Sequence, residues 1–228
     1  MSNPPLTKIE HPPATLRDIV QDRMREAIID GHFKPGDRLV ERPLCDQLGV
    51  SRTVIRETIR YLEAEGLVEI LPGRGPIVAR MSWDDARQIY DIRRMLETAA
   101  ARTCAKRMTP ELGRRLEQAL DQLKAGFDEQ TPGALFRATA GFYAVIFDGA
   151  GHNVAWEIVQ RLNGRISRLR MMTLSTQDRS QPGPAHMRAI CDAILSGDAD
   201  AAQTAVNNHL DDATAVAERL LANAPKES

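Results

Sequence analysis

The chain has 228 residues, a formal net charge of -1 at pH 7 and three widely separated cysteines, Cys45, Cys104 and Cys191. Its length accommodates two small domains, and a hydrophobic content of 43% is ordinary for a protein with a buried core. Scattered cysteines argue against a disulfide framework. The sequence also has no apolar run of membrane-spanning length and no apolar signal core, so we expect a cytoplasmic protein.

The first forty residues predict a tail, a helix and a turn. Residues 1–13 contain four prolines and no apolar periodicity, which is typical of a mobile tail. Apolar residues at helical spacing then predict a helix that starts at Leu16 and ends at Asp30-Gly31. The segment KPGDRLVE predicts a Pro-Gly turn followed by a very short strand.

Two short helices and a hairpin follow. A helix is expected from Pro43 to a stop at Gly49, and Ser51 is placed to cap a second helix over 52–65. The apolar segments LVEIL and PIVAR, split by Pro72-Gly-Arg-Gly, predict a two-stranded hairpin. Two helices joined by a tight turn and followed by a hairpin describe a winged helix-turn-helix, so residues 14–80 are predicted to form an α+β DNA-binding domain.

Every later segment is predicted to be helical. Ser82-Trp83-Asp84-Asp85 is a capping-box start, and no strand pattern follows it. Helices are expected at 83–107, 110–129, 132–148, 153–173, 184–196 and 199–222. The fold class is therefore mainly α, a winged helix-turn-helix followed by an all-α helical bundle over residues 82–222.

The second predicted helix carries an arginine stripe, Arg52, Arg56 and Arg60, on a face opposite its apolar residues. Arg52 and Arg56 share a face near its start, where a recognition helix meets base edges, and arginine binds guanine O6 and N7 bidentately. The apolar face is expected to form a small core, made of Ile28, Leu44, Leu48, Val54, Ile55, Ile59, Leu62 and Leu67. On an isolated helix such arginines are more often a solvated face paired with acids, but the surrounding module favours DNA reading.

The quoted motifs resemble the N-terminal domain of GntR-type bacterial transcriptional regulators, from about Leu16 to Val78. PGDRLVE, LGVSRT, RE-x-I-x-x-L, EGLV and an RG wing occur in order. The resemblance implies operator contacts at matching positions, namely Arg42, Ser51, Arg52, Thr53, Arg56 and Gly75, and Arg74 lies beside Gly75 in the wing. Pro43, Cys45 and Val54 depart from the family pattern without removing a donor, so they bear on the preferred base sequence.

The second half is similar to the FCD domain of the FadR-like branch of these regulators. IYDIRRMLETAAARTCAKRMTPE, FYAVIFDGAGHNVAWEIV and PAHMRAICDAILSGDADAAQTAVNNHL carry the resemblance. It implies a homodimer and a cavity for a small organic acid or related metabolite. We expect the protein to act as a repressor. The residues expected to face the effector are Arg93, Thr139, Tyr143, Arg165, His186 and His209.

Many FCD domains hold a divalent ion of the zinc or nickel type, and the resemblance supplies His186 and His209 as two of the ligands. Thr139 and Tyr143 occupy the positions of the family's aspartate and histidine. Because two imidazoles fall short of the three or four ligands that hold zinc tightly, we expect a metal-free pocket in which these four residues grip the effector.

Two alternatives remain open from the sequence. The helical domain serves dimerisation alone in the first, and it is a metal-dependent enzyme in the second. We expect no enzyme, since the chain has no nucleophile elbow, P-loop, GxGxxG or HExxH motif.

Overall fold

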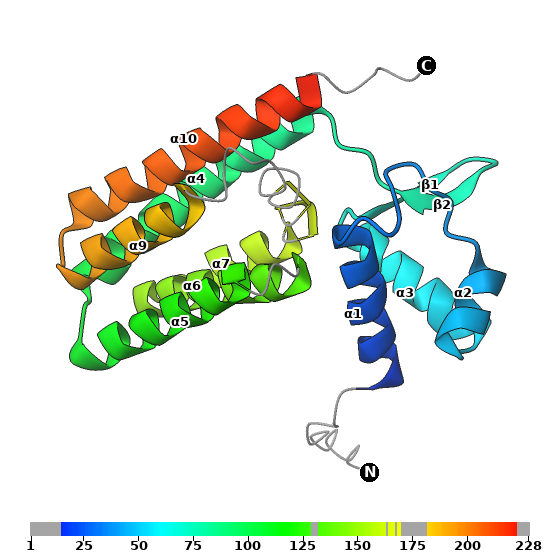
Figure 1. Ribbon diagram of the computed structural model, residues 1–228, viewed down its shortest axis with the longest axis horizontal. Helices are drawn as coiled ribbons and strands as arrows, with labels where there is room; N and C mark the ends of the chain where they lie inside the picture. The colour runs from blue at the N-terminus through cyan, green and yellow to red at the C-terminus, as the bar shows by residue number, and fades with distance from the viewer. Residues whose placement is uncertain (1–14, 129–131, 163, 167, 170–181, 223–228) are drawn as a thin grey trace, which may run out of the picture.

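The computed structural model describes residues 15–128, 132–162, 164–166, 168–169 and 182–222. These residues form mostly α-helices, with one two-stranded sheet (Figure 1). Their buried apolar side chains fall into two clusters, one in an N-terminal unit and one in a C-terminal helical unit. The predicted fold class, a winged helix-turn-helix followed by an all-α bundle, is confirmed.

The N-terminal unit opens with α1 (Leu16–Ile29). Its start carries a capping box, in which Thr15 and Asp18 each accept a hydrogen bond from the other's backbone N–H. This box satisfies two donors that would otherwise lack a helical partner. One face of α1, with Val20, Met24 and Ile28, is buried in the core of the unit.

A tight turn joins α2 (Glu41–Leu48) to α3 (Arg52–Ala64). Gly49 ends α2 with a left-handed φ of 66°, and the Ser51 side chain caps α3 by accepting from the Val54 N–H, as predicted. α2 begins two residues before the predicted Pro43. A proline is tolerated there because the first N–H groups of a helix have no helical acceptor.

The hairpin completes the winged unit. β1 (Val68–Leu71) pairs antiparallel with β2 (Gly75–Val78), so that Val68 lies opposite Val78. The short strand predicted before α2 is a single bridge between Arg38 and Ile77. Behind the hairpin lies the predicted core of α1, α2 and α3, in which Ile55 and Leu62 are completely buried and Leu48 and Val54 are partly buried.

The helical unit begins with α4 (Trp83–Lys106), which Ser82 caps as predicted. The remaining helices are α5 (Pro110–Asp128), α6 (Pro132–Ala150), α7 (Asn153–Arg161), α9 (Pro182–Leu195) and α10 (Ala199–Ala222). α10 packs along α4 and α9 in one layer, and α5 and α6 form a second layer against them (Figure 1). Among the described residues, none of these helices has the length and apolar composition that a membrane span requires.

The single helix predicted over 153–173 is wrong. α7 ends at Arg161, and helical turns resume only at 164–166 and 168–169, while residues 170–173 lie outside the described residues. Glycine is a poor helix former, and Gly164 stands at this break. A Cβ on Gly164 would lie 2.8 Å from Cγ of Leu67 in the N-terminal unit, so the close approach requires glycine.

The three cysteines are free, which agrees with the absence of a predicted disulfide framework. Cys104 and Cys191 are buried in the helical core. Burial raises the pKa of Cys104 to about 11 and that of Cys191 to about 12, so both remain thiols at neutral pH.

Residues 164–166 and 168–169 contact both units, and we call them the bridging segment. Ile166 and Leu169 belong to the helical core, whereas Gly164 meets Leu67 and a guanidinium N–H of Arg168 donates to the Ala79 carbonyl. An ion pair between Arg137 of α6 and Glu26 of α1 adds a second contact between the units. α1 therefore faces the helical unit, as Figure 1 shows.

Candidate nucleic-acid interface and effector site

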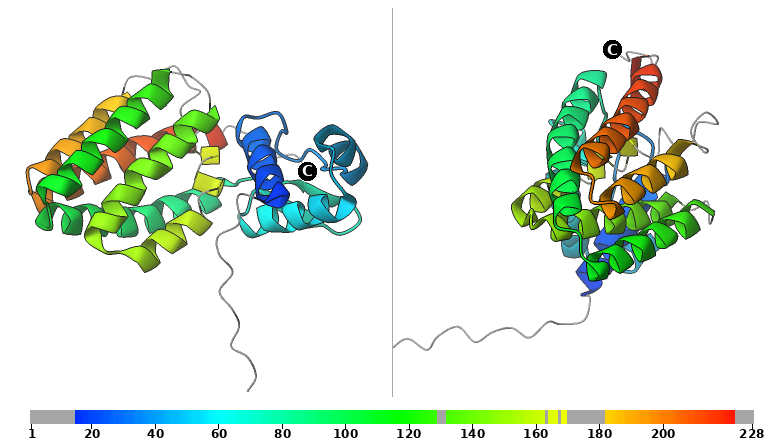
Figure 2. Two further views of the ribbon diagram at one scale, coloured as in Figure 1. Left: turned by 90° about the horizontal axis from the view of Figure 1, so that it is seen from below. Right: turned by 90° about the vertical axis from the view of Figure 1, so that its left-hand side faces the viewer.

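The N-terminal half of α3 presents the polar face predicted for DNA reading. Arg52, Thr53 and Arg56 are exposed, as is the capping residue Ser51. The opposite face, which includes Ile55 and Ile59, is buried. This end of α3 points away from the helical unit, and the helix lies at the edge of the N-terminal unit in Figure 2.

The remaining predicted DNA-contact residues lie around this helix. Arg42 is exposed in the first turn of α2, and Arg74 is exposed at the tip of the hairpin. Gly73 and Gly75, on either side of Arg74, have left-handed φ values of 76° and 77°, a conformation that glycine adopts readily. The exposed donors predicted for DNA contact thus lie at the start of α2, at the start of α3 and at the tip of the hairpin.

The sequence analysis missed a partner of the recognition helix. Nε of Arg56 donates to Oε1 of Glu41 at 2.7 Å, which ties the start of α2 to α3. The hydrogen bond to Arg56 and the charges of Arg56 and Arg52 lower the pKa of the Glu41 carboxyl, so it stays ionised at neutral pH. One member of the stripe, Arg56, is therefore paired with an acid in this structure.

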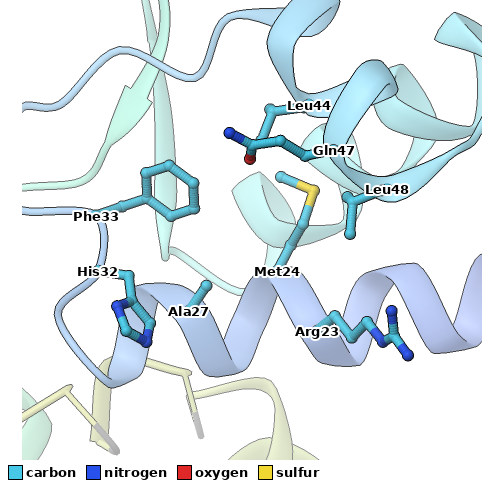
Figure 3. Close-up of a pocket in the computed structure, with 8 residues that line it drawn as sticks. All are labelled: Arg23, Met24, Ala27, His32, Phe33, Leu44, Gln47 and Leu48. Carbon is cyan, nitrogen blue, oxygen red and sulfur yellow. The ribbon is translucent and has the colours of Figure 1, made fainter.

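A cavity of about 240 Å³ lies between α1 and α2 (Figure 3). Met24 and Phe33 face each other across it, with Leu44 of α2 above, and Arg23 and His32 lie at its edge. The cavity belongs to the winged unit, so it is separate from the effector residues predicted in the helical unit.

The helical unit buries an ion pair on α4. Arg93 is 1% exposed, and its Nε and Nη2 donate to the two carboxylate oxygens of Glu97 at 2.7 and 3.3 Å. Burial alone would lower the pKa of Arg93, but the Glu97 carboxylate outweighs it and raises that pKa, with Tyr143 and Tyr90 adding to the effect. Arg93 therefore faces an acid already, and its charge is neutralised before any effector arrives.

Two of the predicted effector residues come from α6. Thr139 and Tyr143 are 7% and 2% exposed, so both are inside the bundle. The Thr139 hydroxyl donates to the Leu135 carbonyl at 2.7 Å, and the Tyr143 ring meets Phe142 edge-on with 5.9 Å between ring centroids. Electrostatic coupling of Tyr143 to Arg93 links this helix to the pair on α4.

The two predicted histidines come together from the last two helices. The ring centroids of His186 on α9 and His209 on α10 are 5.8 Å apart. Nε2 of His186 lies 2.8 Å from Oδ2 of Asp212, one turn beyond His209, so Asp212 orients the His186 ring. His209 is 7% exposed and His186 is half-buried, which puts the pair between the core and the surface.

Arg165 does not join the other predicted effector residues. Its side chain is exposed and lies against Gly66, where an added Cβ would be 2.3 Å from the position of Nε of Arg165, so the contact is with the winged unit. The helix predicted over 153–173, on which Arg165 was expected to lie, ends at Arg161. We therefore leave Arg165 out of that site.

The residues present do not fit the divalent ion that FCD domains often hold. Among the described residues, no three His, Cys, Asp or Glu side chains gather as a metal site. The Thr139 hydroxyl already donates a hydrogen bond to the Leu135 carbonyl, and Nε2 of His186 already faces Asp212. Two imidazoles remain, fewer than a tight zinc site needs.

Glu97 and Asp212 could have been found from spacing alone. Glu97 lies four residues after Arg93 and Asp212 three after His209, and residues at these spacings share a helix face. The Glu41–Arg56 pair has no such local signal, because its members come from different helices.

Comparisons with known proteins agree with this architecture. The family model for bacterial regulatory proteins of the gntR family matches residues 16–78, and the FCD domain model matches residues 88–212. The HTH-type transcriptional repressor RspR of Escherichia coli (strain K12) is 28% identical over 190 residues, 82% of each chain. The HTH-type transcriptional regulator Mce2R of Mycobacterium tuberculosis (strain CDC 1551) is 27% identical over 231 residues, 92% of this chain and 93% of its own.

Solved structures show the same fold. A GntR transcriptional regulator from Rhodococcus sp. RHA1 superposes with a TM-score of 0.75 at 26% identity, over 92% of this chain and 99% of that chain. E. coli McbR/YncC gives a TM-score of 0.74 at 19% identity, over 90% of this chain and 98% of its own, which shows likeness of fold alone.

A winged helix-turn-helix with an exposed basic recognition helix, joined to a ligand-binding type of helical domain, defines a DNA-binding transcription regulator and not an enzyme. The chain belongs to the GntR family of bacterial regulatory proteins and carries an FCD domain.

The buried pair on α4 generates a stability prediction. Replacing Glu97 by Gln leaves the Arg93 charge without a counter-charge in the core, and breaking a buried pair in this way costs about 3–5 kcal/mol of unfolding free energy. Chemical denaturation of the two proteins measures the difference.

A matched control lies on the same helix. Asp91→Asn removes the acid of the exposed Arg87–Asp91 pair, where N–O is 3.5 Å, and should change the unfolding free energy by less than about 1 kcal/mol. Equal losses for the two variants would contradict the importance of burial at Glu97.

Proposed function

We propose that this regulator binds a palindromic operator as a homodimer, acts as a repressor, and responds to a small organic acid or related metabolite. The observation that carries the proposal is the exposed face of Arg52 and Arg56 at the free end of α3, in a winged unit whose other end contacts the helical unit. The name of RspR, a transcriptional repressor, supports the direction of regulation.

Base recognition is assigned to Arg52 and Arg56, and positioning on the backbone to the other predicted residues. Arginine offers parallel N–H donors to guanine O6 and N7, whereas donors at a helix start suit phosphates. The phosphate and wing contacts are assigned to Arg42, Ser51, Thr53, Arg74 and Gly75. A two-fold symmetric protein then requires a two-fold symmetric operator.

The dimer is assigned to an apolar face on α4 and α7. Three large apolar side chains of the described helical unit are strongly exposed: Met95 at 64%, Val154 at 72% and Ile158 at 44%. Val154 and Ile158 are one turn apart on α7, which contacts α4 along one side of the bundle (Figure 2). Covering this face with the same face of a second copy would remove its apolar surface from water.

The effector is assigned to a metal-free pocket bounded by α6, α9 and α10. Hydroxyl and imidazole groups of Thr139, Tyr143, His186 and His209 supply hydrogen-bond partners for a carboxylate and its neighbours. Arg93 acts behind them, because its guanidinium is neutralised by Glu97 and coupled to Tyr143. Binding there would shift the equilibrium between spacings of the two DNA-reading units, through the bridging segment.

The first prediction of this proposal concerns the arginines. Arg52→Ala and Arg56→Ala should each weaken operator binding roughly tenfold to a hundredfold and remove the preference for one base pair per half-site. Arg74→Ala should weaken all sequences more evenly, since a wing contact to the backbone carries no base preference. The measurement is the affinity of each variant for operator and scrambled duplexes. An unchanged base preference in both α3 variants would refute the assignment of α3 as the recognition helix.

The second prediction concerns the dimer. Val154→Glu and Ile158→Glu should yield monomers by sedimentation, because a buried carboxylate without a partner opposes association. The monomers should also bind the palindrome weakly, since a second half-site no longer gains effective concentration. Gln160→Glu, an exposed charge addition on the same helix, should stay dimeric, and dimeric Ile158→Glu would contradict the assignment.

The third prediction concerns the pocket. Protein purified without added metal should contain no stoichiometric ion, and a thermal-shift screen of small carboxylic acids should give a stabilising ligand before and after chelator treatment. Tyr143→Phe should reduce that shift while preserving the fold. A stoichiometric ion that is required for the shift would refute a metal-free pocket, and no stabilising acid would favour a dimerisation-only domain.

A further inference from the structure

Glu41 occupies a special position among the acids of the winged unit. It is the first residue of α2, its side chain is 32% exposed, and its carboxylate contacts Arg56 of α3. Two other acids of the unit are held elsewhere, since Glu57 pairs with Arg17 of α1 and Glu65 pairs with Arg25 of α1. Glu41, by contrast, contacts a residue that is assigned to the DNA face.

In the Glu41–Arg56 pair, the carboxylate bonds to only one edge of the guanidinium. Glu41 accepts from Nε of Arg56 at 2.7 Å, so the hydrogen bond uses the side of the guanidinium nearest the chain. The two terminal nitrogens then remain for another acceptor. They offer parallel N–H donors at the spacing of guanine O6 and N7, so the pairing leaves free the edge that reads guanine end-on.

Holding Arg56 in this way restricts a flexible side chain. An exposed arginine samples many rotamers, and fixing it on binding costs conformational entropy. A side chain whose Nε is already bonded has lost part of that freedom, and the planar guanidinium is oriented by a single well-placed hydrogen bond. The constraint favours one direction of approach to the base pair.

The charge of Glu41 acts in a second way. A carboxylate at the DNA face repels phosphates of every sequence, and it neutralises part of the arginine charge that would attract them. Only DNA with a guanine opposite Arg56 offsets this repulsion through two directional hydrogen bonds. The acid therefore lowers the affinity for every duplex, but it lowers the affinity for the correct duplex least, so the ratio between the two affinities increases.

We propose that Glu41 is a specificity-determining residue of operator binding, which orients Arg56 toward one guanine and suppresses binding to DNA that lacks it. This inference rests on the proposed function, because it takes Arg56 as a base-reading residue. A merely structural role for Glu41 is also available, since an acid in the first turn of a helix interacts favourably with the helix dipole. Discrimination between bases separates the two roles.

The experiment uses the full-length protein and an operator selected in vitro from random duplexes. Arg56→Ala first identifies the base pair at which preference is lost. Dissociation constants are then measured on the operator, on the operator with that one pair changed, and on a random duplex. The variants are Glu41→Gln, which keeps an acceptor of the same shape, and Glu41→Ala, which keeps none.

The variants are expected to lose discrimination between bases without losing affinity for random DNA. Discrimination at the identified pair should fall about tenfold in Glu41→Ala and less in Glu41→Gln, while affinity for the random duplex stays the same or rises. In Arg56→Ala protein, adding Glu41→Ala should change discrimination no further, because the two residues act through one contact. Asp46→Ala, which removes an exposed acid near the other end of α2, should leave discrimination unchanged.

Other outcomes overturn the inference or the function beneath it. If Glu41→Ala and Glu41→Gln weaken all three duplexes equally, or leave discrimination intact, Glu41 is structural and the inference is wrong. Circular dichroism of both variants identifies a folding loss, and the Gln variant retains the test if Ala unfolds α2. If Arg56→Ala and Arg52→Ala change no base preference, the proposed function fails instead.

Discussion

The close approach at Gly164 constrains the arrangement of the two units. Leu67 belongs to the core of the winged unit, and Ile166, two residues after Gly164, belongs to the core of the helical unit. Because residue 164 is a glycine and has no Cβ, the main chain approaches Leu67 closely; an added Cβ would lie 2.8 Å from Cγ of Leu67. The two cores are thus separated by the thickness of a single main chain, and a shift of the bridging segment in one core bears directly on the other.

Polar contacts around this point restrict how the units can move. Residues 79–82, between β2 and α4, form the linker between the units. Arg168 is buried beside this linker and donates to the Ala79 carbonyl, and burial lowers the pKa of its guanidinium. Arg137 and Glu26 are more exposed, so water and salt screen their attraction and the pair adds little to stability. Of the two contacts, the buried one has more to lose if the linker shifts, because a guanidinium left without an acceptor stays in a dry site.

Much of the fold could be predicted because its signals are local. Ser51, Gly49 and Ser82 act on backbone groups within four residues, and the apolar spacing of α3 predicts which face is buried. The close approach of Gly164 to Leu67 could not be predicted, since the two residues lie about a hundred positions apart in sequence. The candidate site divides in the same way: exposure of Arg52 follows from helix periodicity, whereas the pairing of Arg56 with Glu41 and the removal of Arg165 to Gly66 depend on tertiary packing.

The contact of Arg168 with the linker is made to a main-chain oxygen. Every amino acid at position 79 presents that carbonyl, so the side chain there can change without removing the acceptor. The contact with Arg165 is different, because an added Cβ at Gly66 would meet its guanidinium, so position 66 is restricted to glycine. Over evolutionary time, this joint therefore tolerates substitution at position 79 but not at position 66, and a winged unit that diverges elsewhere, at its exposed face, can keep the same helical half.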